Sequence, residues 1–182
     1  MEVATWIYAV KIRLLRQVDL PALEWDGEYT HFRRIYSDAY DRAKSGLSIL
    51  WVADMPEVGI IGQLFVQLNN EWTQLVGGEK RGYIYAFRIR PTYRNGGLGS
   101  RMLEVAEADL ERRGFDTVTL NVAKNNPDAQ RLYERFGYRV VSSEPGRWSY
   151  PDEKGVWHNV EEPAWHMEKK LPKIDKGGLR GF

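Results

Sequence analysis

The chain of 182 residues contains no cysteine. This absence excludes a disulfide framework, a cysteine-based zinc site and a thiol nucleophile. The sequence also lacks any apolar run approaching the roughly 18 residues that span a bilayer. We therefore expect a soluble, cytoplasmic protein with no membrane partner. Lysine and arginine number 26 against 25 acidic residues, so no overall positive field is available to hold nucleic acid, and we expect no such partner.

The length and the 43% share of hydrophobic residues favour one compact domain. We assign this domain to residues 1–171, because no internal repeat or linker divides them. Residues 172–182 show no apolar period, and we expect them to form a mobile tail.

The spacing of apolar residues predicts a series of strands and helices, since a period of two is typical of strands and spacings of three and four are typical of helices. Strands are expected at residues 6–16, 47–54, 58–68, 83–90, 117–123, 138–141 and 164–171. Helices are expected at residues 29–43, 98–113 and 127–136. Residues 142–163 are rich in proline and glycine, and are expected to form a long loop or a loosely paired hairpin.

Residues 88–101 join a strand, a proline and a glycine-rich turn to the start of a helix. Between Arg81 and Arg101 the chain has five arginines and no acidic residue. Glycines let a backbone turn tightly, and a helix start offers unpaired N–H groups at the positive end of its dipole. The stretch therefore predicts a site for a small anionic ligand. An ordinary glycine-rich turn with solvated arginines is the alternative.

The sequence of this turn does not match two other phosphate-binding motifs. A dinucleotide fingerprint that starts at Gly97 needs a glycine where the chain has Met102. The Gly-Lys-Ser/Thr ending of a P-loop is missing as well.

A second informative stretch, residues 126–138, predicts a helix that Asn126 caps and Pro127 begins. Four apolar or aromatic residues share one face of this helix by their spacing. They are Ala129, Leu132, Tyr133 and Phe136. On this spacing alone, Tyr133 is a core aromatic residue whose hydroxyl finds some hydrogen-bond partner.

Together the two stretches resemble the GCN5-related N-acetyltransferase superfamily. The family motif of Arg or Gln, two residues, Gly, one residue, and Gly or Ala matches Arg94, Gly97 and Gly99. The later family motif matches Asn126, Ala129, Leu132, Tyr133, Gly137 and Tyr138. The first 80 residues match only in pattern. The resemblance implies a mixed α/β fold, with a mainly antiparallel central sheet, one splayed pair of parallel strands and flanking helices.

The resemblance also implies that acetyl-CoA lies between the strands at 83–90 and 117–123. The pantetheine arm would then pair with the backbone of Phe87, Arg88 and Ile89. The residues implied to hold the pyrophosphate are Arg94, Asn95, Gly96, Gly97, Leu98, Gly99 and Ser100. Asn126 is implied as a polar contact near the cofactor thiol or amide, although its capping position alone would explain its presence.

In the implied reaction an amine attacks the thioester directly, and a backbone N–H near Ile89 stabilises the oxyanion. Tyr133 would protonate the leaving thiolate, since a phenol with a pKa near 10 is protonated where a thiol of pKa near 8.5 ionises. Many family members have a glutamate where this chain has Tyr85, and residues 83–90 contain no carboxylate. The general base is therefore not identified.

Four residues are candidates for contact with the acceptor: Glu24, Glu28, Tyr85 and Trp148. For Glu24 and Glu28, solvated acids at a helix start are the favoured interpretation. Trp148 can instead pack its loop on the sheet. No metal is expected, because His158 and His166 fit no zinc spacing.

The sequence thus predicts an acetyl-CoA-dependent N-acetyltransferase that acts on a primary amine of a small molecule or of a peptide or protein terminus. A CoA-binding module without catalysis is one alternative, which the missing carboxylate at Tyr85 favours. A transferase of longer acyl groups is another. The oligomeric state stays open, with a homodimer among the options.

Overall fold

The computed structural model of the chain describes residues 5–68 and 78–173. The expectation of a mobile tail falls largely on residues 174–182, outside the described residues. The main element is a sheet of seven strands in the order β1-β2-β3-β4-β5-β9-β6. Its strands are β1 (Lys11–Leu14), β2 (Ser48–Met55), β3 (Gly59–Leu68), β4 (Arg81–Ile89), β5 (Thr117–Ala123), β6 (Arg139–Glu144) and β9 (Ala164–Lys170).

Helical segments cover both faces of this sheet. The α-helices are α1 (Arg33–Lys44), α3 (Leu98–Arg112) and α4 (Pro127–Arg135). Shorter 3₁₀ turns are η1 (Thr5–Ala9), η2 (Gln17–Gly27), η3 (Thr30–Phe32) and η4 (Pro91–Tyr93). None of the helices in the described residues has both the length and the apolar character needed to cross a membrane.

The pairing of the strands is antiparallel except between β4 and β5, which run parallel. This arrangement confirms the predicted fold class of a mixed sheet with one parallel pair. These two strands are also the pair that the family resemblance implied, at residues 83–90 and 117–123.

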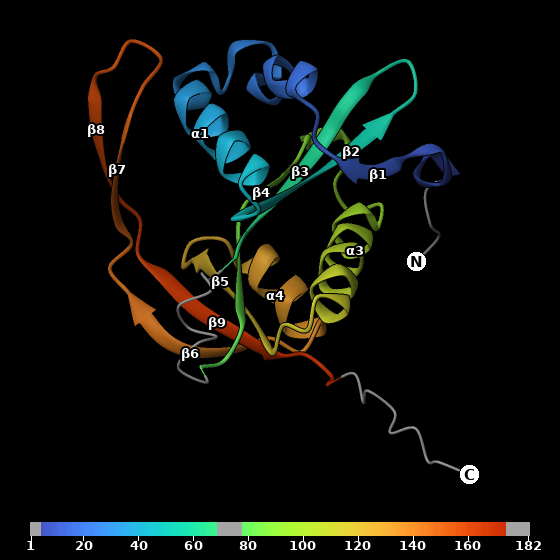
Figure 1. Ribbon diagram of the computed structural model, residues 1–182, viewed down its shortest axis with the longest axis vertical. Helices are drawn as coiled ribbons and strands as arrows, with labels where there is room; N and C mark the ends of the chain where they lie inside the picture. The colour runs from blue at the N-terminus through green and yellow to red at the C-terminus, as the bar shows by residue number, and fades with distance from the viewer. Residues whose placement is uncertain (1–4, 69–77, 174–182) are drawn as a thin grey trace.

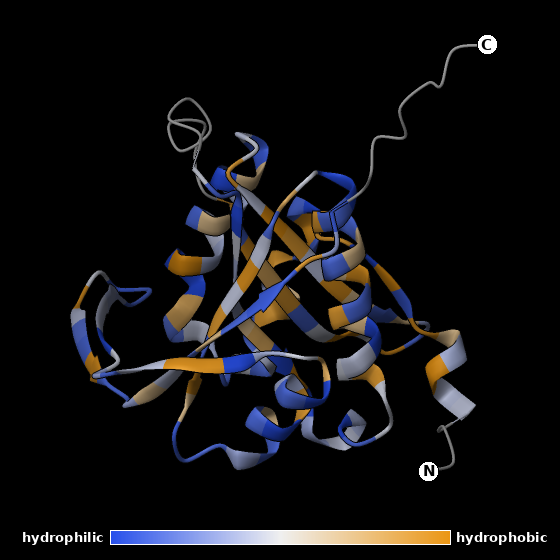
Figure 2. Cartoon of the chain, turned by 90° about the horizontal axis from the view of Figure 1, so that it is seen from below, coloured by the Kyte–Doolittle hydropathy of each residue, from blue (hydrophilic) through white to orange (hydrophobic). Residues whose placement is uncertain are grey.

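Two buried clusters lie on opposite faces of the sheet. Helices α3 and α4 supply Leu103, Leu110 and Tyr133 to one cluster, whereas η2 and α1 supply Leu23 and Tyr36 to the other. Figure 1 shows α1 on one side of β3 and β4, with α3 and α4 on the other side. Hydrophobic residues gather on the strands and on the inner sides of the helices (Figure 2). The sheet is therefore covered on both faces, as the apolar runs of β2 and β3 require.

The N-terminal strand predicted at residues 6–16 is wrong in its first half. Residues Thr5–Ala9 form the 3₁₀ turn η1, and only Lys11–Leu14 pair with β2. Ile7 and Val10 are both buried, and their spacing of three residues suits a 3₁₀ turn rather than an alternating strand. The side chain of Arg101, at the start of α3, also donates a hydrogen bond to the carbonyl of Ile7.

The helix expected at 29–43 begins with the 3₁₀ turn η3 before α1 starts at Arg33. Residues 142–163 were expected to form a long loop or a loosely paired hairpin, and the hairpin is confirmed. It consists of β7 (Arg147–Pro151) and β8 (Trp157–Glu161). Asp152 fixes its turn by accepting hydrogen bonds from the N–H groups of Lys154 and Val156, both at 2.9 Å. The hairpin extends beside α1 in Figure 1.

A bulge in β4 changes which side chains share a face. The pairing of β3 with β4 shifts between Gln63 and Phe65, and Ala86 takes a left-handed φ of 49°. Before the bulge, Tyr85 packs with the α1 cluster. After it, Phe87 packs with the α3 cluster, although strict alternation would place it on the same side as Tyr85.

An ion network fixes the segment between β1 and η2. Arg13 donates to both carboxylate oxygens of Asp19, at 2.7 and 3.0 Å, and to Asp54 at 2.9 Å. The backbone N–H of Arg16 also donates to Asp19 at 2.8 Å. The pKa of Asp19 is lowered well below its usual range, mainly by the hydrogen bond from Arg13. Asp19 therefore stabilises the fold only while it is ionised.

We predict that Asp19→Asn lowers the free energy of unfolding by about 2 kcal/mol at pH 7, because hydrogen bonds to a charged group are lost. A carboxyl group whose pKa is depressed by folding contributes stability above its unfolded pKa of about 3.9, and this contribution is lost as the pH falls. Denaturant unfolding should show that the difference in free energy of unfolding between the parent and the variant shrinks below about pH 4. The exposed Asp38→Asn serves as control. A difference that does not depend on pH would contradict the assignment.

Candidate active site

The two parallel strands separate part-way along their length. Their paired residues run from Arg81 with Thr117 to Ile84 with Leu120. Beyond this point β4 continues to Ile89 and β5 to Ala123, but no further pairing joins them. The backbone of β4 after Ile84 therefore has no strand on its β5 side, and an extended ligand can pair with it. Phe87, Arg88 and Ile89, the predicted pantetheine contacts, all lie in this open stretch.

The glycine-rich turn between β4 and α3 leaves a row of donors free. Asn95 and Gly97 both have left-handed φ values, 61° and 90°. The first main-chain bond of α3 runs from the N–H of Arg101 to the carbonyl of Gly97, at 3.1 Å. No described residue accepts a hydrogen bond from the N–H groups of residues 95–100. These include all the predicted pyrophosphate contacts except the side chain of Arg94.

Arg94 and Gly99 fix this turn against the open end of β4. The Nε of Arg94 donates to the carbonyl of Ile89 at 2.9 Å, and its side chain is exposed. A Cβ atom at Gly99 would lie 3.3 Å from Leu132, 3.5 Å from Ile89 and 3.7 Å from Phe87. The glycine therefore lets α3 approach both β4 and α4 closely, so the free N–H groups lie next to the separated strands.

Tyr133 lies on α4 beside the separated strands, 8% exposed, with its ring 6.5 Å from Phe87 and 5.7 Å from Tyr138. Its hydroxyl makes no hydrogen bond with a described residue, so the partner that its spacing suggested is missing. The hydroxyl of Tyr138 is fully buried, whereas that of Tyr133 keeps some accessible surface. Burial, with a smaller effect from Tyr83, raises the pKa of Tyr133. It is therefore a protonated donor at neutral and moderately alkaline pH.

Asn126 has the capping role that its sequence position predicts. Its Oδ1 accepts a hydrogen bond from the N–H of Ala129 at 3.2 Å, and Pro127 follows it at the first helical position. This bond uses only the oxygen of the amide, so the Nδ2 group of Asn126 is free to contact a ligand. That contact stays a prediction.

The predicted acceptor residues divide into two groups. Tyr85 stacks on Tyr83 at 6.2 Å and meets Phe65 edge-on at 5.7 Å, with its hydroxyl buried and without a partner among the described residues. Trp148, on β7, is 43% exposed and its ring lies 6.2 Å from Phe32. Both belong to a continuous set of aromatic rings on the α1 face of the sheet, here called the aromatic group. Its other members include Tyr29, Phe32, Tyr36, Phe65 and Tyr150.

Glu24 and Glu28 do not project into that aromatic group as free acids. Glu24 accepts hydrogen bonds from Arg33 at 2.6 Å and Thr30 at 2.9 Å, and the pKa of its carboxyl is lowered, chiefly by Arg33. The interaction ties η2 to the start of α1. Glu28 is exposed and has no side-chain partner among the described residues.

The side chain of Arg88 is a feature that the sequence analysis missed, since only its backbone was assigned. Its guanidinium lies among aromatic rings from η2, η3 and α1, and closest to Tyr29, which lies between η2 and η3. The many aromatic residues between 25 and 36 were a visible signal. Nothing in the sequence located the bulge at Ala86 that turns Arg88 toward them.

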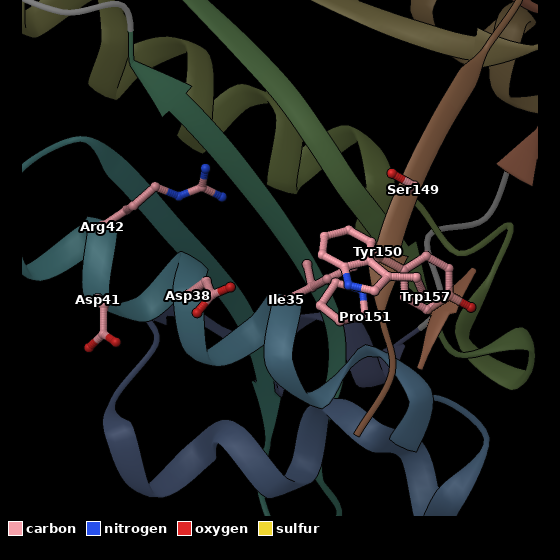
Figure 3. Close-up of a pocket in the computed structure, with 8 residues that line it drawn as sticks. All are labelled: Ile35, Asp38, Asp41, Arg42, Ser149, Tyr150, Pro151 and Trp157. Carbon is pink, nitrogen blue, oxygen red and sulfur yellow. The ribbon is translucent and has the colours of Figure 1, made fainter. Parts of the chain in front are cut away.

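A groove of about 450 Å³ lies between α1 and the β7–β8 hairpin. Figure 3 shows Ile35 pointing toward Tyr150 and Pro151, while Asp41 points away from the hairpin. Asp41 pairs with Lys44 at 2.7 Å. The groove lies away from the separated strands, and Tyr150 connects it to the aromatic group through a contact of 5.0 Å with Phe32.

The histidines considered for a metal site lie in different environments. His158 contacts Asp152 at 2.8 Å in the hairpin, whereas His166 contacts Asn121 at 2.7 Å on the sheet. Within residues 5–68 and 78–173, no three groups of the metal-ligating types lie together.

A sequence model described as the Acetyltransferase (GNAT) family matches residues 14–138, which include the open strand, the turn and Tyr133. The chain belongs to this family. The match confirms the resemblance on which the sequence analysis relied.

Among curated relatives of this GNAT chain is a mycothiol acetyltransferase of Streptomyces coelicolor, 36% identical over 67 residues, which are 37% of this chain and 22% of the relative. The chloroplastic GCN5-related N-acetyltransferase 6 of Arabidopsis thaliana is 31% identical over 88 residues, or 48% of this chain and 29% of that protein. The matches thus span less than a third of these relatives.

Solved GNAT structures share the fold at low identity. The ribosomal-protein-S18-alanine N-acetyltransferase of Escherichia coli has a TM-score of 0.67 at 20% identity, over 95% of this chain and 99% of that one. Arabidopsis thaliana NAA60 in complex with acetyl-CoA has a TM-score of 0.68 at 18% identity, over 89% and 98%.

We predict that Asn126→Ala destabilises the protein by about 1 kcal/mol, because the N-terminus of α4 loses its cap. Asn126→Asp should keep most of that stability, since a carboxylate oxygen can accept the same bond. Denaturant unfolding of both variants measures this. If Asn126→Asp is stable but binds CoA more weakly, the amide also contacts the cofactor. Unchanged stability in Asn126→Ala would contradict the capping role.

Proposed function

We propose that this GNAT protein is an acetyl-CoA-dependent N-acetyltransferase that acetylates a primary amine of a small molecule or of a peptide terminus by direct attack. One observation carries the proposal. The unpaired edge of β4 after Ile84 lies beside the uncapped start of α3, so a thiol-bearing arm and its diphosphate can bind in one continuous site. An extended arm needs the first feature, and a diphosphate needs the second.

In this proposal the open edge of β4 pairs with the pantetheine arm through Phe87, Arg88 and Ile89. The free N–H groups of residues 95–100 bind the diphosphate, with Arg94 and the dipole of α3 adding positive charge. The structure of NAA60 in complex with acetyl-CoA supports the cofactor assignment, because that protein has the same fold. Acetyl-CoA would supply an activated acetyl group as a thioester.

The amine attacks the thioester carbonyl carbon as the neutral base, and a tetrahedral oxyanion forms. A backbone N–H on the open stretch of β4, near Ile89, stabilises that oxyanion. The carbon–sulfur bond then breaks, and Tyr133 donates its proton to the leaving thiolate. The nitrogen releases its extra proton to water, because β4 offers no carboxylate as a base. Tyr133 carries the proton that this step needs, because burial raises the pKa of its hydroxyl.

A non-catalytic CoA-binding module is a second candidate, and one observation favours it. Tyr85 occupies the position where many family members have a glutamate, and its buried hydroxyl has no partner among the described residues. Such a module would keep the function of the glycine-rich turn without turnover.

We predict that Gly97→Val weakens CoA binding by more than about tenfold, because a branched side chain strains the left-handed backbone at φ 90° and misplaces the N–H groups beside it. Isothermal titration calorimetry measures the affinity. Gly114→Val is the matched control, since Gly114 is also left-handed, at φ 75°, but lies at the far end of α3. Equal affinities in the two variants would show that the turn does not hold the diphosphate.

We also predict that Tyr133→Phe retains CoA binding but slows amine-dependent thiol release by about a hundredfold, the usual scale of lost acid catalysis. A thiol-reactive dye follows the release from acetyl-CoA with a panel of amines. Tyr138→Phe removes a buried hydroxyl from the adjacent ring, and should leave the rate near that of the parent. If both variants match the parent, Tyr133 has no role as the acid.

A further inference from the structure

Arg88 places a charged group at the boundary between the open strand and the acceptor half. Its guanidinium carbon lies 3.7 Å from the ring centroid of Tyr29, 5.4 Å from that of Phe32 and 5.9 Å from that of Trp25. One of its terminal nitrogens donates a hydrogen bond to the hydroxyl of Tyr36. Aromatic faces hold a cation by their quadrupoles, so these rings define where the guanidinium lies.

The Arg88 side chain has no acidic partner in the described residues. No carboxylate of residues 5–68 and 78–173 lies within 4.0 Å of its nitrogens, although the half-buried Arg13 and Arg90 each have such a partner. A partly buried charge is normally paired. A guanidinium has five N–H donors, and only one contact to a side-chain oxygen is made here. The remaining donors are available to a ligand.

The acidic residues near Arg88 do not form a binding site for a cationic ligand. Glu24 is held by Arg33 and Thr30, and Asp26 accepts a hydrogen bond from Arg90 at 3.3 Å. The carboxylates predicted to meet the acceptor are therefore paired or exposed. Arg88 is therefore the charged residue at the aromatic group that has no acidic partner among the described residues.

We propose that Arg88 binds a carboxylate of the acceptor, so that the substrate is an amine that also bears a carboxylate. This inference rests on the proposed acetyl transfer and names the substrate class. Arginine suits a carboxylate because two parallel N–H groups match its two oxygens. The backbone of Arg88 lies in the open stretch of β4, so a carboxylate at its side chain brings the attached amine toward the strand edge where the acetyl group would lie.

Two sources offer this chemistry, a free amino acid and a peptide with an acidic residue next to its amino terminus. The test uses free amino acids with their carboxamides, and tripeptides with Asp or Glu at the second position with their Asn or Gln counterparts. Rates are compared at equal concentrations of unprotonated amine, because amidation changes the pKa of an amino group. The pair in which the acid is preferred over its amide identifies the source of the carboxylate.

Arg88→Met removes the charge but keeps most of the length of the side chain. We expect it to raise KM for carboxylate-bearing acceptors by about tenfold or more, and by a clearly larger factor than KM for their neutral counterparts. Arg88→Lys should lie between, because an ammonium group keeps the charge but loses the paired geometry. Arg139→Met is the control, since Arg139 is exposed on β6. Circular dichroism checks folding, and Arg88→Lys carries the test if Arg88→Met does not fold.

Equal KM values for charged and neutral acceptors in the parent, or equal changes for both in Arg88→Met, would overturn the role of Arg88. Acetyl transfer itself would still stand in that case. If the parent binds CoA but acetylates no amine in the panel, the proposed function fails instead. Calorimetric titration of the same acids and carboxamides into the CoA-bound protein then decides. Binding of the acids that Arg88→Met abolishes supports the site, and absence of that binding overturns it.

Discussion

The loss of pairing between β4 and β5 after Ile84 is the constraint on which the candidate site depends. A sheet interior normally satisfies every backbone N–H and carbonyl, so an unpaired strand edge there needs a partner of another kind. The seven-stranded sheet makes this opening possible, because β2 and β3 support β4 on one side while β9 supports β5 on the other. Each strand remains anchored after it leaves its neighbour.

The start of α3 extends that unsatisfied backbone into a second region. Gly99 brings the helix against Ile89 and Leu132, so the free N–H groups of the turn follow directly from the open edge of β4. The local charge agrees with this arrangement, since residues 81–101 contain arginines and no acid. An anion at the turn and an extended chain along β4 can therefore belong to one ligand.

The sequence allowed this half of the molecule to be predicted because its signals are local. Glycines at fixed spacing, the cap at Asn126 and the apolar face that includes Tyr133 all act within one or two helical turns. The acceptor half could not be predicted in the same way. Glu24 is neutralised by Arg33, nine residues away, and the turn η1 is set by contacts between Ile7 and α3. Such contacts depend on tertiary packing, which apolar spacing does not encode.

The bulge at Ala86 connects the two halves, and it was also invisible in the sequence. The buried Gln63 donates from its side-chain amide to the carbonyl of Ala86 at 3.1 Å, which holds the irregular backbone in place. The bulge turns Phe87 toward Tyr133 and leaves Arg88 facing the aromatic residues of the α1 side. Bulges commonly redirect side chains next to active sites. This single bulge therefore places two consecutive residues of β4 on opposite faces of the sheet. Phe87 lies next to the candidate acid, and Arg88 is the candidate contact of the acceptor.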